Sequence, residues 1–119
     1  MTKVLVVEDD PTNMKLACEI LNAQGFMVHG AKDGADAINM AEKEHYDLIL
    51  MDIGMPGIDG IETTKIIKNK LQYKDVPVIA LTAYSMKGDK ERILAAGLDD
   101  YISKPIDVSD FMKRLEKYM

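Results

Sequence analysis

Cysteine is almost absent from the sequence, since Cys18 is the only one among 119 residues. An internal disulfide and a thiolate-rich metal site are therefore excluded, and this usage is typical of a reducing compartment. Long apolar runs are lacking as well: the sequence has no stretch of roughly 18 apolar residues and no pattern of a signal peptide. We therefore expect a cytoplasmic protein that does not insert into a membrane.

Positive charge is also scarce, because the sequence has 15 Lys and Arg residues but 20 Asp and Glu residues, which gives a formal net charge of −5. This balance argues against binding to the phosphate backbone of nucleic acids. The length suits one domain, and 47% apolar residues are enough to fill one core. Linkers, internal repeats and low-complexity tails are not evident, so we predict a single domain over residues 1–119.

Short β-branched runs alternate with longer stretches of helical character along the chain. Asp10-Pro11 has the pattern of a helix start and Gly25 that of a helix end, and Asp107 is the predicted N-cap of the last helix. We predict strands at 3–7, 27–31, 47–51, 76–81 and 100–103, and helices over about 35–44 and 61–71. A further helix is predicted between Gly88, near its start, and Gly97, which closes it, and the last helix carries its apolar residues at helical spacing from Val108.

Five strands that alternate with five helices predict an α/β fold, in which a five-stranded parallel sheet is doubly wound and carries helices on both faces. Each crossover between parallel strands must be long enough to hold a helix and is right-handed. In such sheets, ligands bind outside the carboxyl ends of the strands, where the strand order reverses. The functional residues are therefore expected at that edge.

Polar residues follow the apolar strands at their carboxyl ends. Glu8 and Asp9 come after the first predicted strand, Asp52 after the third, Thr82 after the fourth and Lys104 after the fifth. Burying an unpaired charge costs several kcal/mol, so Asp52 should face a polar edge and a cation. Folding should bring these five residues together although they are far apart in the sequence.

Carboxylates that lie this close repel one another unless a cation compensates. An all-oxygen site of this kind suits Mg²⁺, for which Mn²⁺ can substitute. A metal ion and the ammonium group of Lys104 around Asp52 would form a cradle for a phosphoryl group, to which Thr82 could donate a hydrogen bond. Asp52 could then act as a nucleophile that forms an aspartyl phosphate.

Four motifs in this order, VLVVEDD, LILMDIGMPGIDG, VIALTA and YISKP, resemble those of the response regulator receiver family, the CheY-like proteins. The resemblance covers essentially the whole chain. The stretches NMKL and AYSMKGDKERI are most similar to single-domain regulators of the DivK type and to receiver modules of hybrid histidine kinases. The resemblance implies a flavodoxin-like sheet with the strand order 2-1-3-4-5.

The resemblance also implies a role for each residue of the site in a two-component phosphorelay. Asp52 would accept a phosphoryl group from a histidine kinase or a phosphotransfer protein in a magnesium-dependent reaction. Asp9 would bind the metal directly, Glu8 mainly through water, and Gly54 through its backbone carbonyl. Lys104 would pair with the phosphoryl oxygens.

The same resemblance implies how the signal leaves the site. The Thr82 hydroxyl would move toward the phosphoryl group, and the Tyr101 side chain would then rotate toward the space that Thr82 leaves. This movement would change the face made by the fourth helix, fifth strand and fifth helix, to which a downstream protein would bind. The Lys104-Pro105 peptide bond would be cis. We expect a monomer that catalyses its own phosphorylation and dephosphorylation and turns over no external product.

Other classes share part of the pattern. A phosphohydrolase of the haloacid dehalogenase type would have a second acid two residues after Asp52, where this chain has Gly54. A flavodoxin would have a first loop rich in Ser, Thr and Gly, whereas EDDPTN is acidic, and a DNA-binding regulator would continue into a helix-turn-helix. A receiver module excised from a hybrid kinase, and a small phosphohydrolase with an Asp nucleophile, remain as alternatives.

Overall fold

The structure, a computed structural model, describes residues 2–54, 60–82, 87–104 and 106–118. Its strands form one parallel sheet in the order β2-β1-β3-β4-β5, which confirms the predicted topology. The strands are β1 (Lys3–Val7), β2 (Met27–Ala31), β3 (Leu48–Asp52), β4 (Val78–Thr82) and β5 (Asp100–Ser103). The helices are α1 (Pro11–Ala23), α2 (Gly34–Lys43), α3 (Gly60–Lys68), α4 (Lys87–Ala95) and α5 (Val108–Glu116), with a short 3₁₀ helix η1 (Leu71–Tyr73).

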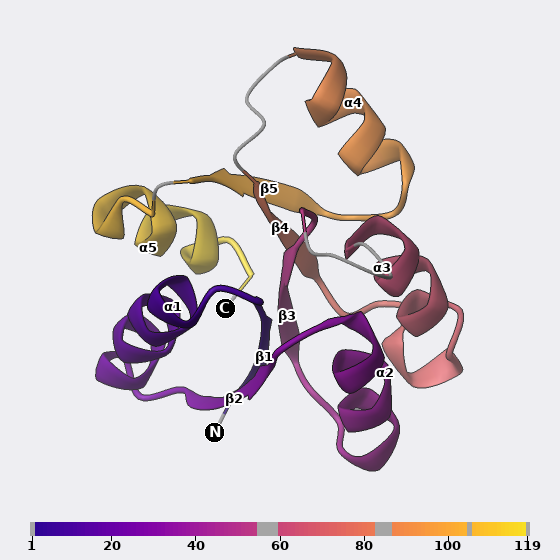
Figure 1. The fold of residues 1–119 in the computed structure, drawn as a ribbon, viewed down its shortest axis with the longest axis horizontal. Coiled ribbons are helices and arrows are strands. Elements are labelled where there is room, and N and C mark those ends of the chain that lie inside the picture. The colour runs from indigo at the N-terminus through magenta and orange to yellow at the C-terminus, as the bar shows by residue number, and fades with distance from the viewer. Residues whose placement is uncertain (1, 55–59, 83–86, 105, 119) are drawn as a thin grey trace.

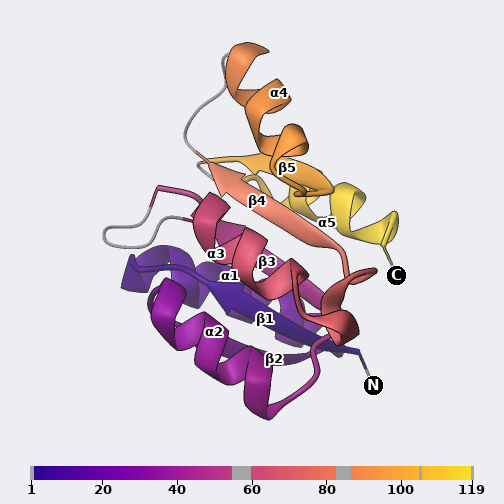
Figure 2. The ribbon, with the colours of Figure 1, turned by 90° about the vertical axis from the view of Figure 1, so that its right-hand side faces the viewer.

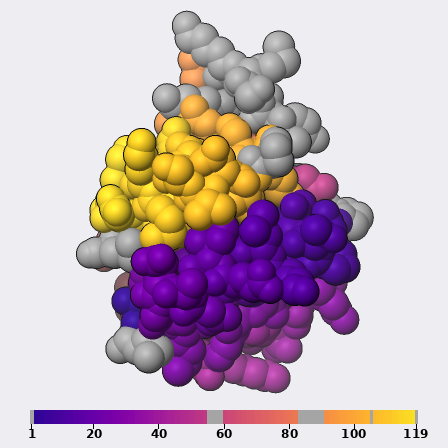
Figure 3. Space-filling model, turned by 90° about the vertical axis from the view of Figure 1, so that its left-hand side faces the viewer, coloured from indigo at the N-terminus to yellow at the C-terminus, as the bar shows by residue number. Residues whose placement is uncertain are grey.

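The sheet lies between two layers of helices. In Figure 1, α1 and α5 cover one face of the sheet and α2, α3 and α4 lie on the other. Figure 3 shows α5 packed directly beside α1 on the first of these faces. None of the described helices is long and apolar enough to cross a membrane.

The pleat of the strands divides the buried side chains between two cores. Alternate residues of a strand point to opposite faces, so the neighbours Leu5 and Val6 of β1 belong to different apolar clusters. Phe111 of α5 is fully buried in one cluster and Ile67 of α3 in the other. Because both faces are covered, β3 and β4 are buried along their whole length.

Aspartates at three helix starts explain where these helices begin. Asp10, Asp33 and Asp107 each have extended backbone and accept a hydrogen bond from a backbone N–H of the first turn. Such a bond satisfies one of the helix's unpaired donors. The caps predicted at Asp10 and Asp107 are therefore confirmed.

Three predicted boundaries are corrected by the structure. β3 includes Asp52 because the ladder continues past it, with the N–H of Ile53 donating to the carbonyl of Leu81 at 3.2 Å. β4 likewise runs over Val78–Thr82 rather than 76–81. The helix predicted over 61–71 ends at Lys68, and the chain then forms η1.

Candidate functional site

The carboxyl ends of β1, β3 and β5 bring four charged residues together. β1 and β3 are in register with Val7 beside Met51, so Glu8 and Asp52 each lie one residue beyond that pair. On the other side, Thr82 pairs with Ser103, and the N–H of Lys104 donates to the carbonyl of Thr82 at 2.7 Å. This register places Lys104 at the same carboxyl edge of the sheet as Glu8 and Asp52.

Lys104 forms ion pairs with two buried carboxylates. Its Nζ lies 2.9 Å from Oε2 of Glu8 and 3.2 Å from Oδ2 of Asp52. The second oxygen of each carboxylate accepts a backbone hydrogen bond: Oε1 of Glu8 from Asp10 at 3.2 Å, and Oδ1 of Asp52 from Gly54 at 2.9 Å. The charge of Asp52, which is only 4% exposed, is thus compensated from two directions.

Asp9 completes a group of three carboxylates. One carboxylate oxygen from each of Glu8, Asp9 and Asp52 lies within 4.8 Å of the other two. These residues line an open cleft of about 300 Å³. The remaining described residues that line it are Asp10, Asn13, Gly54 and Lys104.

The donor set of this cleft fits a hard divalent cation. All candidate ligand atoms are oxygens, which is the preference of Mg²⁺. Oε2 of Glu8 is buried and accepts no hydrogen bond from any described residue, although the ammonium group of Lys104 forms an ion pair with it. A buried carboxylate oxygen in this position has capacity left for a further cationic partner.

Two of the predicted site residues, Thr82 and Tyr101, are not among the described residues that line the cleft. Thr82 is the last residue of β4 and is 1% exposed. Tyr101 pairs with Ala80, two residues before Thr82, so the side chains of Tyr101 and Thr82 point to the same face of the sheet. The guanidinium group of Arg114 lies 5.1 Å from the centre of the Tyr101 ring.

Comparison with known proteins decides which family has this cleft. Residues 4–116 match the family model for the response regulator receiver domain. The chain belongs to the response regulator receiver family. This membership accounts for the acidic cleft in preference to the phosphohydrolase and flavodoxin alternatives.

Curated receiver proteins of similar length resemble the chain along its whole length. It is 44% identical to the polar-differentiation response regulator DivK of Brucella ovis, covering 100% of this chain and 98% of that protein. The DivK of Brucella anthropi is 42% identical over 98% of this chain and 94% of its own length. The chain is therefore homologous to DivK response regulators of two-component signalling.

Solved receiver structures share the fold. The chemotaxis protein CheY4 of Vibrio cholerae matches with a TM-score of 0.95 and 30% identity, covering 100% of this chain and 99% of that one. The receiver domain of the sensor histidine kinase PA1611 from Pseudomonas aeruginosa matches with a TM-score of 0.90 and 37% identity over 98% and 96% of the two chains. That structure holds a magnesium ion in its active-site cleft, and receiver domains bind Mg²⁺ at an acidic pocket of this kind.

The receiver cleft shifts the pKa values of its charged residues in different directions. Burial raises the pKa of Glu8 to about 7, although Lys104 acts against this. Burial also acts to raise the pKa of Asp52, but the Gly54 N–H, Glu8 and Lys104 together lower it below its usual value. For Lys104, burial alone would lower the pKa, and the two carboxylates more than offset this and raise it.

Sequence reasoning found Glu8, Asp9, Asp52, Gly54 and Lys104, and the structure brings all five to one cleft. It missed Asn13, which lines the same cleft from the first turn of α1. Its position could have indicated this, because Asn13 lies in the first turn of the helix that follows the acidic residues Glu8 and Asp9. The predicted cis bond involves Pro105, which lies outside the described residues.

Proposed function

We propose that this receiver domain accepts a phosphoryl group on Asp52 from a histidine kinase or phosphotransfer protein, and signals by binding other proteins in a phosphorylation-dependent way. The observation that carries the proposal is the pairing of Asp52 with Lys104 at 3.2 Å beside the carboxylates of Glu8 and Asp9. The family membership and the DivK relatives support it. Residues 1–119 would act as one receiver unit.

The lowered pKa keeps Asp52 ionised, as a nucleophile requires. A carboxylate oxygen of Asp52 attacks phosphorus while the bond from phosphorus to the imidazole nitrogen of the donor breaks. The electron pair of that bond returns to the imidazole, and the phosphoryl group becomes an acyl phosphate on Asp52. Lys104, which pairs with Asp52 at 3.2 Å, would neutralise charge on the phosphoryl oxygens, and positioning with charge neutralisation would supply the catalysis.

Glu8, Asp9 and Asp52 would hold Mg²⁺, for which Mn²⁺ could substitute, with the carbonyl of Gly54 as a further ligand. The ion would compensate the excess negative charge of the cleft when phosphate arrives. Receiver domains typically do not act on external substrates. In our proposal this domain catalyses only its own phosphorylation and dephosphorylation.

The signal would leave through Thr82 and Tyr101. A phosphoryl group on Asp52 offers the Thr82 hydroxyl a charged acceptor, and movement of Thr82 would open space on the face of the sheet that it shares with Tyr101. The face made by α4, β5 and α5 would then bind a downstream protein. We place the monomeric protein in the cytoplasm, which its one free cysteine favours.

Phosphorylation with phosphoramidate, a small donor that contains a phosphorus–nitrogen bond, tests the acceptor. In the presence of Mg²⁺, mass spectrometry should detect one phosphoryl group on the wild-type chain. Chelation of Mg²⁺ and the Asp52→Asn variant should each abolish it, whereas Asp75→Asn, which removes an exposed carboxylate outside the cleft, should not. Labelling of Asp52→Asn at the wild-type rate would refute the assignment.

A further inference from the structure

A basic and apolar surface on α3 and η1 has the features of a docking site and lies apart from the phosphoryl-acceptor cleft. Residues 63–74 contain four lysines and no acidic residue, although the net charge of the chain is −5. Figure 2 looks onto this side of the molecule, with α3 in front of the sheet. We call the surface the α3 patch and define it by Lys65, Ile66, Asn69, Lys70, Leu71 and Lys74.

The α3 patch carries positive charge that the described residues neutralise only in part. Nζ of Lys70 pairs with Glu42 of α2 at 2.9 Å, and Nζ of Lys68, beside the patch, pairs with Asp99 at 3.0 Å. Lys65 and Lys74 are exposed, and neither forms an ion pair with any residue in the described part of the chain. These two ammonium groups are therefore available to an acidic partner.

The patch also combines a groove with exposed apolar side chains. A groove of about 510 Å³ is lined by Lys65, Ile66, Asn69 and Lys70. Leu71 follows directly in the chain and is 87% exposed, the highest value among the large apolar residues that the structure describes. A single exposed leucine is ordinary, but this one directly follows Lys70, which lines the same groove as Ile66, and Ile66 is itself 37% exposed.

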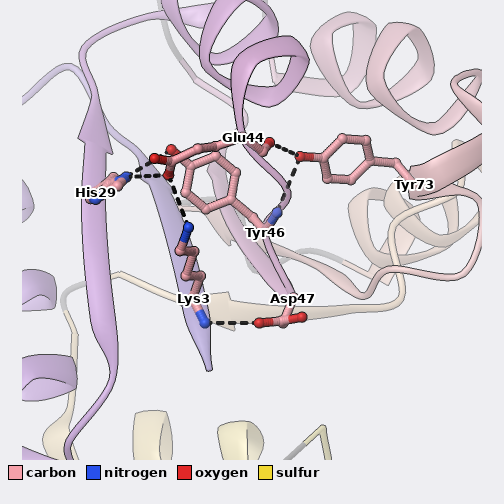
Figure 4. Close-up of polar contacts among 6 residues, drawn as sticks. All are labelled: Lys3, His29, Glu44, Tyr46, Asp47 and Tyr73. Atoms are coloured by element: carbon pink, nitrogen blue, oxygen red, sulfur yellow. Dashed lines mark hydrogen bonds and ion pairs between the residues drawn. The ribbon is translucent and has the colours of Figure 1, made fainter. Parts of the chain in front are cut away.

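Buried contacts hold the patch in place. Tyr73 of η1 is fully buried, and its hydroxyl donates to the carbonyl of Glu44 at 2.7 Å and accepts the N–H of Tyr46 at 3.2 Å (Figure 4). The stacked ring of His45 covers Tyr73 at a centroid distance of 5.3 Å. Leu71 is thus exposed on an anchored turn, and a preorganised surface loses little entropy when a partner binds.

We propose that the α3 patch docks an acidic segment of a partner protein, with a carboxylate of that segment on Lys65 and an apolar side chain on Leu71. Charge complementarity indicates an acidic partner, because residues 63–74 form a basic segment of an acidic chain. The groove beside Ile66 can admit a protruding side chain of such a segment, and the vesicle experiment below tests a lipid surface in its place.

This interaction is separate from phosphorylation. The patch lies on the face of the sheet that carries α2 and α3, whereas α5 lies on the opposite face (Figure 1). A partner on the α3 patch would leave α5 accessible to another protein. The proposal therefore does not depend on Asp52 as a phosphoryl acceptor.

The test is an amide chemical-shift titration of the isotope-labelled full chain with a synthetic amphipathic helical peptide built from Glu and Leu. We expect saturable shifts confined to residues 63–74 and a dissociation constant that rises with salt. Leu71→Ser and Lys65→Gln should each weaken binding about tenfold, equivalent to about 1.4 kcal/mol. Val108→Ser and Lys113→Gln on α5 are matched controls and should leave the dissociation constant unchanged.

Three outcomes would overturn the proposal. One is the absence of saturable shifts at millimolar peptide, and another is equal binding of a peptide in which Gln replaces Glu. The third is that the chain fails to bind the peptide but associates with vesicles of phosphatidylcholine and phosphatidylglycerol, and that Leu71→Ser and Lys65→Gln each abolish this association. Such a result would assign the patch to a membrane surface. Thermal unfolding of each variant should match the wild type, because the substituted side chains are exposed.

Discussion

Glu8 and Asp52 are carboxylates in the same cleft, yet their surroundings shift their pKa values in opposite directions. Asp52 receives a hydrogen bond from Gly54 and faces Lys104, which stabilise its charged form. For Glu8 the effect of burial is larger than the stabilising effect of Lys104. The cleft thus holds one carboxylate whose charged form is favoured, as the proposed nucleophilic role of Asp52 requires, and another that binds a proton more readily than a free glutamate does.

We predict that the raised pKa of Glu8 makes the metal-free protein less stable as the pH rises. Between pH 4.5 and about 7, the folded state keeps a proton on Glu8 that the unfolded state releases. The free energy of unfolding should therefore fall across this window, by at most about 1.4 kcal/mol for each pH unit. Urea unfolding with chelator at several pH values measures this, and an identical slope in Glu8→Gln would contradict it.

Crowding of the three carboxylates predicts that Asp9→Asn stabilises the metal-free protein. Removing one charge from a group whose oxygens lie within 4.8 Å should raise the free energy of unfolding by about 1 kcal/mol. The same change should reduce the extra stability that Mg²⁺ confers by binding the folded state. Urea unfolding with and without Mg²⁺ measures both effects. Glu19→Gln removes an exposed acid outside the cleft and should cause neither.

At the scale of elements, the start of α3 is packed against the end of β3. A Cβ atom added to Gly60 would overlap the carbonyl oxygen of Asp52 and lie 2.6 Å from Cα of Ile53. The hydroxyl of Thr64 also donates to the carbonyl of Gly60 at 2.7 Å. A residue without a side chain is therefore needed where α3 begins, so that the helix can lie against the strand that presents Asp52.

We predict that Gly60→Ala destabilises the protein by about 1 to 3 kcal/mol, because backbone atoms must move to admit the methyl group. Gly54→Ala is the matched control, since its Cβ would lie 3.6 Å from Oδ1 of Asp52, an ordinary contact. Thermal or urea unfolding distinguishes the two variants. Equal free energies of unfolding for the two variants would contradict this prediction, because they would show that the backbone around Gly60 can move to admit a methyl group without loss of stability.

At the scale of the whole molecule, the sheet connects the cleft with the face made by α4, β5 and α5. Thr82 ends a buried strand beside β3, and Tyr101 lies on the neighbouring edge strand. Moving a two-state equilibrium from 1:99 to 99:1 requires about 5.5 kcal/mol. A few charge-assisted hydrogen bonds to a phosphoryl group, at about 1.5 to 3 kcal/mol each, are sufficient.

We predict that Thr82→Ala leaves Asp52 open to phosphorylation but uncouples it from β5 and α5. Amide chemical shifts of β5 and α5 should change on phosphorylation of the wild type and change little in the variant, with equal phosphoryl incorporation in both. Ser103, whose side chain is exposed, is the residue that pairs with Thr82 across the ladder, and Ser103→Ala should behave as wild type. Full shift changes in Thr82→Ala would exclude Thr82 as the coupling residue.

Several features of the structure could not be predicted from the sequence. The pattern over 61–71 is helical throughout, but the chain leaves α3 after Lys68 and forms η1. Tyr73 anchors η1 by hydrogen bonds to the segment between α2 and β3, a contact between residues far apart in the sequence. The opposite pKa shifts of Glu8 and Asp52 likewise depend on burial and on partners from other strands.

The sequence by itself determined the alternation of strands and helices, the parallel sheet with helices on both faces and the group of residues at the site, and its resemblance to the receiver family indicated the strand order. Apolar periodicity, capping aspartates and polar residues at strand ends are local signals, and parallel strands leave few ways to connect them. Only the tertiary structure decided the pairing of Lys104 with both Glu8 and Asp52, the close approach of Gly60 to β3 and the exposure of Leu71. Distances, burial and pKa values arise from contacts between elements, and these exist only once the chain has folded.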